Sequence, residues 1–131
     1  MVAKKHTLGK NERLKSRKRT ELLFSEGKKF SITPFRVHYL FNDLAGPPLQ
    51  FGVGVSSKNF KKAVDRNKIK RRVREAYRLQ KIILHQKVKE KKGQLNIFFI
   101  YNGKDIPGFS GIFDAMKKIL DKLCNIIDSE K

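Results

Sequence analysis

Residues 51–84, FGVGVSSKNFKKAVDRNKIKRRVREAYRLQKIIL, set the architecture of this chain because they contain one strand followed by the strongest helix. Bulky and small residues alternate over residues 50–56, and a period of two predicts a strand there. From Val64 to about Leu84 apolar residues recur at helical spacing instead, at Ile69, Val73, Ala76 and Ile83. The helix is therefore expected to bury one side and to leave the other in solvent.

The sequence after this helix predicts one more strand and one more helix. A charged exit, the connecting segment that leaves this helix at residues 85–92, ends at Gly93. Residues 95–101 then form a nearly continuous apolar run, typical of a strand buried on both faces. Strand, helix and strand in succession predict a βαβ unit. A last amphipathic helix is expected to cover one sheet face through Ile112, Phe113, Met116, Ile119, Leu120, Leu123 and Ile127.

The sequence before residue 50 predicts a short helix and two strands. Ser16 caps the helix, Leu22, Leu23 and Phe24 give it an apolar patch, and Gly27 ends it. A strand over 28–32 is followed by a clearer one whose faces alternate, with Phe35, Val37, Tyr39 and Phe41 on one side and Arg36, His38 and Leu40 on the other. A loop over 42–48 then connects it to the strand at 50–56, and we expect these two strands to form an antiparallel pair.

Composition indicates one domain and a polyanionic partner. The 131 residues carry a formal charge of +19, and 21 basic against 6 acidic residues lie in 1–78, compared with 10 and 6 in 79–131. Residues 1–15 are expected to be a basic mobile arm, and 16–131 a single RNA-binding domain. No apolar run approaches the roughly 20 residues that span a bilayer, so we expect a cytoplasmic protein and no membrane contact.

Residues 58–78 point to nucleic acid. Lys and Arg dominate this segment, and only Asp65 and Glu75 carry the opposite sign, so repulsion would weaken the isolated helix. Asn67, Arg71, Arg74 and Arg78 fall in one narrow stripe opposite the apolar row. Phosphates would offset the repulsion, although a merely solubilising helix has the same composition. The face of 50–56 that holds Gly52 and Gly54 would admit either a closely packed helix or an RNA strand.

This run, RNKIKRRVREAYR at 66–78, resembles the signature helix of the bacterial ribonuclease P protein family. The similarity extends upstream through Phe51–Ser56 and through Leu14–Gly27, and beyond Gly93 it lies in the pattern more than in the residues. The resemblance implies an α/β (α+β) two-layer sandwich, with a mostly antiparallel four-stranded sheet and a left-handed βαβ crossover. A domain of one ribosomal protein has the same class of fold.

The resemblance also implies the site residues. On the signature helix, RNA phosphates would be contacted by Arg66, Asn67, Lys68, Lys70, Arg71 and Arg74. A cleft for the single-stranded 5′ leader of precursor tRNA would be lined by Phe24, Phe35, Tyr39, Lys58 and Lys62, although Phe35 and Tyr39 also suit the core. Two positions depart from the family pattern, because Thr20 replaces a second cleft aromatic and Lys68 replaces an Arg with its planar fork.

In this family the protein is a subunit of an endoribonuclease whose RNA carries out catalysis. The chain is therefore expected to have no active site and no bound cofactor, to act with magnesium held by the RNA subunit, and to need no protein partner. His6, His38 and His85 are scattered, and Cys124, the one cysteine, suits a small apolar helix position better than a nucleophile. The alternatives are a structural or ribosomal-type RNA-binding protein, a self-sufficient nuclease and a DNA-compacting protein.

Overall fold

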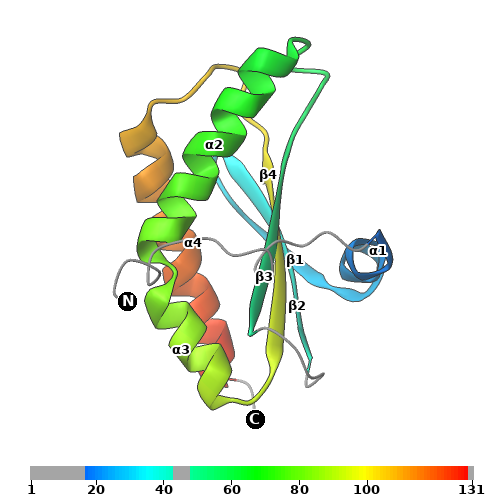
Figure 1. The fold of residues 1–131 in the computed structure, drawn as a ribbon, viewed down its shortest axis with the longest axis vertical. Helices are drawn as coiled ribbons and strands as arrows, with labels where there is room; N and C mark the ends of the chain where they lie inside the picture. Colours follow the sequence, from blue (N-terminus) through cyan, green and yellow to red (C-terminus); the bar gives the residue numbers. More distant parts are fainter. Residues whose placement is uncertain (1–16, 43–47, 130–131) are drawn as a thin grey trace, which may run out of the picture.

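The computed structural model describes residues 17–42 and 48–129 as one α+β sandwich (Figure 1). Its elements in chain order are α1 (Arg17–Glu26), β1 (Lys28–Ile32), β2 (Phe35–Asn42), β3 (Leu49–Val55), α2 (Ala63–Gln80), α3 (Ile82–Glu90), β4 (Gln94–Tyr101) and α4 (Phe109–Ser129). The expected arm at 1–15, the Ser16 cap and most of the loop at 42–48 lie outside the described residues. Each expected strand is present, and a helix lies in each of the three segments expected to be helical.

The sheet is mixed, with the strand order β1-β2-β4-β3. Two of its three pairings, β1 with β2 and β2 with β4, are antiparallel, whereas β3 and β4 are parallel. The parallel pairing across α2 and α3 confirms the βαβ unit, whose handedness stays a prediction. The expected pairing of β2 with β3 is wrong, because β4 lies between them. β4 is the most apolar strand, so the central position buries it best.

Helices cover the two faces of the sheet unequally (Figure 1). The core face, from which Val37, Phe51, Ile97 and Phe99 project, packs against α2, α3 and α4. The buried side of α4 matches the expected apolar row, except that Phe113 is half-buried. On the opposite face, which we call the open face, α1 alone among the described helices contacts the sheet, through Phe24. The open face is therefore covered by a helix only where α1 crosses it (Figure 1).

The expected single helix over 64–84 is two helices. α2 ends at Gln80, and Lys81 keeps a right-handed conformation with ψ of −16°, far from the roughly −42° of a regular helix. α3 then occupies the segment expected to be a charged exit. Ile83, expected in the core, is 64% exposed, and Leu84 and Val88 are buried instead. The four-residue spacing of these two residues places both on the core side of α3.

Gly27 is a position at which the chain approaches itself too closely for any side chain. Its N–H donates to the Leu23 carbonyl, and a Cβ would lie 2.3 Å from that oxygen and 2.7 Å from the Tyr39 carbonyl oxygen. We expect Gly27→Ala to lower the free energy of unfolding by about 1–3 kcal/mol in urea titration, since backbone must move. The matched control is Gly108→Ala, where nothing lies within 4 Å; equal effects of the two variants would contradict this reading.

Candidate nucleic-acid interface

α2 presents a basic surface on the side away from the core. Ile69, Val73, Ala76 and Tyr77 are buried, and Asn67, Arg71 and Arg74 on the opposite side are exposed. Lys68 and Lys70 flank this stripe and are half-buried. We call Asn67, Lys68, Lys70, Arg71 and Arg74 the α2 basic face. The aliphatic stems of the flanking lysines can pack along the helix while their ammonium groups stay in water.

Three other arginines of α2 are held by the protein itself. Arg66 Nη1 donates to the carbonyl oxygens of Phe60 and Lys61, at 2.8 and 2.9 Å, and Arg72 donates to the carbonyl of Pro107. Arg78 forms an ion pair with Glu75 one turn earlier. Arg66 therefore braces the loop that enters α2, a role that the sequence did not reveal. Its expected contact with RNA stays a prediction, to be made by the guanidinium donors that remain.

A second candidate surface lies where α1 meets the open face. The Phe24 ring is edge-on to His38 of β2, with centroids 4.6 Å apart, and to Phe98 of β4, at 5.2 Å. Phe24 is 41% exposed. Gly54 of β3 makes room here, because a Cβ at that position would lie 3.0 Å from the Phe98 ring. The Phe98 ring from the neighbouring strand β4 thus fills part of the space left by the glycine of β3.

Two of the residues expected to line this cleft lie on the wrong face. Phe35 is 1% exposed and packs on the Tyr101 ring at 5.5 Å, and Tyr39 packs beside Phe30 on the same core face. Neither can reach a ligand on the open face. The strand instead directs Arg36 and His38 there. The alternation of side chains along β2 was visible in the sequence. It did not show which of the two faces the helices would cover.

Lys58 and Lys62 are exposed, as expected for residues that bind a backbone. They lie in the connection between β3 and α2, and Lys62 is the extended residue that precedes the helix. Asn59 in the same connection donates from Nδ2 to the Gly103 carbonyl oxygen at 3.4 Å. These lysines therefore lie at the end of the sheet where α2 starts, the upper end in Figure 1.

The electrostatic surroundings of His38 are positive. Burial lowers the pKa of its imidazole from the ordinary 6.5, and the charges of Lys29 and Arg36 lower it further. The imidazole is consequently neutral at pH 7. An anion placed beside these three residues would reverse the effect of the two cations and would favour the protonated ring.

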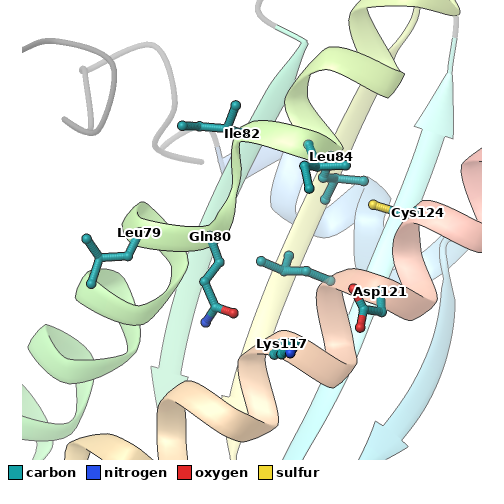
Figure 2. Close-up of a pocket in the computed structure, with 9 residues that line it drawn as sticks. Leu79, Gln80, Ile82, Leu84, Lys117, Asp121 and Cys124 are labelled. Atoms are coloured by element: carbon teal, nitrogen blue, oxygen red, sulfur yellow. The ribbon is translucent and has the colours of Figure 1, made fainter. Parts of the chain in front are cut away.

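The helical side carries a separate hollow of about 310 Å³ (Figure 2). It lies between the α2–α3 junction and α4, and its lining includes Leu79, Ile83, Lys117, Asp121 and Cys124. Burial raises the pKa of the half-buried Cys124 thiol. Within residues 17–42 and 48–129 there is no group of three His, Cys, Asp or Glu side chains able to hold a metal ion. No helix in those ranges is long and apolar enough to cross a bilayer.

Comparison with known proteins indicates one family for this chain. The family model described as Ribonuclease P matches residues 8–124. A protein named ribonuclease P protein component from Porphyromonas gingivalis is 37% identical over 123 residues, which cover 93% of this chain and 90% of that protein. Another of the same name from Nitrosococcus oceani is 42% identical over 62 residues, 47% of this chain and 50% of that protein. The solved RNase P protein of Staphylococcus aureus superposes with a TM-score of 0.67 over 86% of this chain and 95% of that one, at 23% identity, and so shares the fold.

Proposed function

Because this chain belongs to the ribonuclease P protein family, we propose that it binds the catalytic RNA and the 5′ leader of precursor tRNA and promotes removal of the leader. The observation that supports this best is the pair of separate surfaces on one domain. One is a helix face dense in cations, and the other is a partly exposed aromatic cluster where α1 meets the sheet. Together they suit one structured RNA and one single strand.

The α2 basic face is proposed to bind the catalytic RNA. Exposed guanidinium groups such as those of Arg71 and Arg74 form paired hydrogen bonds with phosphate oxygens, and α2 is held rigidly by its buried side. Only Asp65 and Glu75 on this helix are acidic, and Glu75 is already paired with Arg78. The cationic stripe is thus left available to a polyanion, whose binding releases counterions.

The aromatic surface where α1 meets the open face is proposed to hold the leader. Phe24 offers a ring that is 41% exposed, and His38 and Phe98 support it from the sheet. Rings of this kind stack on any base, so this surface would accept many leader sequences. Arg36, which is exposed on the same face, would meet leader phosphates. The surface would therefore add affinity for the precursor over the mature product.

The phosphodiester is proposed to be cut by the RNA subunit with its own magnesium ions, which would activate water and stabilise the leaving oxygen. The described residues offer no cluster that would hold such an ion. What this chain supplies is positive charge between two polyanions and an oriented leader. Both effects lower the free energy of the substrate complex.

The test is multiple-turnover cleavage of precursor tRNA in low magnesium by a bacterial ribonuclease P RNA, with and without this protein. Strong stimulation, with no cleavage by the protein alone, is the expected result. Tight RNA binding without stimulation would instead indicate a structural RNA-binding protein, which would share the basic α2 face. Cleavage by the protein alone would indicate a nuclease.

The pKa of His38 predicts how leader binding depends on pH. Because the folded pKa lies below 6.5, the free protein loses stability as pH falls through 6.5, while a leader phosphate nearby would stabilise the imidazolium. The affinity ratio of precursor to mature tRNA should therefore rise as pH falls from about 7.5 to 5.5. His38→Phe keeps a ring but cannot titrate, so its ratio should stay flat. Identical pH profiles for both proteins would contradict this assignment.

A further inference from the structure

α1 is the described helix with the fewest buried side chains. Among its described side chains Leu23 alone is buried, whereas Leu22 and Phe24 are exposed. The helix α3, of similar length, buries both Leu84 and Val88. Leu23 also lies outside the hydrophobic core that the sheet forms with α2, α3 and α4. Displacement of α1 would therefore expose little apolar surface and would leave that core intact.

The charges of α1 oppose its helix dipole at both ends. Its sequence, RKRTELLFSE, starts with three basic residues and ends with Glu26, and it has no acidic residue in the first turn and no basic one in the last. Cations at the N-terminus and anions at the C-terminus are unfavourable, because the backbone dipole has the same sign there. A helix of ten residues is also too short to be stable alone in water. The helix α1 consequently depends on its contacts with the sheet.

The part of the sheet that α1 crosses contains a buried acceptor without a donor. Leu40 and Asn96 are paired on β2 and β4, and on the open face they follow the pair of His38 and Phe98 that Phe24 contacts. Asn96 is 2% exposed, and within the described residues its Oδ1 accepts no hydrogen bond. A dry carbonyl oxygen of this kind is unfavourable, and water would reach it if α1 moved away. The contact between α1 and the sheet thus carries a cost that opening relieves.

The connection between α1 and the sheet is a single residue. α1 ends at Glu26, and β1 begins at Lys28, which is already paired with Tyr39 of β2. Gly27 lies between them, and its N–H donates to the Leu23 carbonyl oxygen at 2.9 Å. Because β1 is held by its own ladder, a rotation at Gly27 would move α1 and leave the sheet in place.

We propose that α1 is a lid on the open face, which opens while the rest of the domain stays folded and closes on the single-stranded leader. Opening separates Phe24 from His38 and Phe98 and uncovers the sheet around Asn96. A base stacked on Phe24 would lose its support in the open state, so a bound leader would favour the closed one. The inference rests on the proposed function only in naming the leader as the strand that the lid holds.

The first experiment is amide hydrogen exchange of the full chain over a urea series, without RNA. The amides of residues 21–27 should exchange through an opening with weak urea dependence, and those of β4 through global unfolding with strong dependence. Ile119→Val in the core should speed exchange in β4 about fivefold and leave α1 unchanged. Equal acceleration of α1 and β4, or equal urea dependence, would show one cooperative unit and would overturn the proposal.

Two variants test the causes of opening. Glu26→Lys gives the exposed end of α1 the favourable charge and should slow its exchange about threefold. The matched control is Glu90→Lys, the same charge change at the exposed end of α3, which should leave α1 unchanged. Asn96→Leu removes the acceptor without a donor and should slow exchange of α1 about tenfold. If Asn96→Leu does not fold, Glu26→Lys decides. Exchange of α1 that neither variant slows would overturn the lid.

The second experiment compares precursor and mature tRNA bound to the reconstituted holoenzyme. The precursor should slow exchange of residues 21–27 about tenfold more than mature tRNA does, since only the precursor carries a leader to stack on Phe24. Equal protection by both RNAs would overturn the closing of the lid on the leader. The proposed function would still stand if wild type stimulates cleavage. Conversely, independent opening of α1 without any stimulation of cleavage would overturn the proposed function alone.

Discussion

Replacing Lys70, Arg71 and Arg74 together by Ala is expected to weaken binding to the catalytic RNA about 100-fold or more and to leave the fold intact. Each of these side chains would make a charge-assisted contact with phosphate, and none has a described partner that the fold needs. The slope of log affinity against log salt should fall by about 2 to 3, since three phosphate contacts are lost. Filter binding over a salt series measures both quantities.

The control for this triple variant removes the same charge elsewhere. Lys89, Lys117 and Lys118 are exposed on α3 and α4, and replacing them by Ala takes away three cations without touching the α2 basic face. If nonspecific charge were all that mattered, both triple variants would lose the same affinity. Arg66 is left out on purpose, because its hydrogen bonds to Phe60 and Lys61 would confound a loss of binding with a displaced loop.

Phe99→Ala is expected to lower the free energy of unfolding by about 3–5 kcal/mol, a large share of the 5–15 kcal/mol typical of a domain. Phe99 is fully buried, and its ring lies 5.8 Å from that of Tyr77 and 6.3 Å from that of Phe51. Tyr77 in turn stacks on Phe51 at 4.2 Å. This cluster fixes α2 to the sheet, so a cavity there loosens the helix that carries the basic face. Urea titration measures the loss.

The neighbouring Phe98 is the matched control, since it projects from the other face of the same strand. Phe98→Ala should cost less stability, because its ring is only half-buried, and should instead lower the affinity for precursor tRNA about tenfold through the lost support for Phe24. Affinity for mature tRNA should not change. Equal loss of stability in the two variants would mean that the open face is part of the core.

Several features could be predicted because they depend on neighbours in sequence. The exposed stripe of α2 follows from helical spacing and is present as expected, and the strand periods at 50–56 and 95–101 place β3 and β4 correctly. Helical spacing could not show which cations of α2 bind other groups of the protein and which are left for a ligand. Arg66, Arg72 and Arg78 have the same side chain as Arg71. In the fold, however, these three arginines bind groups of the protein itself, namely Phe60, Pro107 and Glu75.

Residues of the open face were missed for a related reason. His38 and Phe98 meet Phe24, which lies on a different element, and a hollow lined by Ser31, Thr33 and Asn102 joins segments about 70 residues apart in sequence. Aromatic type suggested Phe35 and Tyr39 for the cleft, yet both project to the core face. Residue type alone is a weak guide to which residues bind RNA, because aromatic rings fill cores as readily as they bind bases.

Local periodicity and charge in this chain were enough to predict the strands, the amphipathic helices and the exposed cationic stripe of α2. The insertion of β4 between β2 and β3, the choice of covered face for each strand, the break at Lys81 and the contacts of Phe24 with the sheet came only with the tertiary structure. The physical reason is that a two-residue alternation shows which side chains share a face, and a 3.6-residue period shows which share a helix side. Which of those faces becomes buried depends on contacts between distant segments, and these are formed by the packing of the whole sheet against its helices.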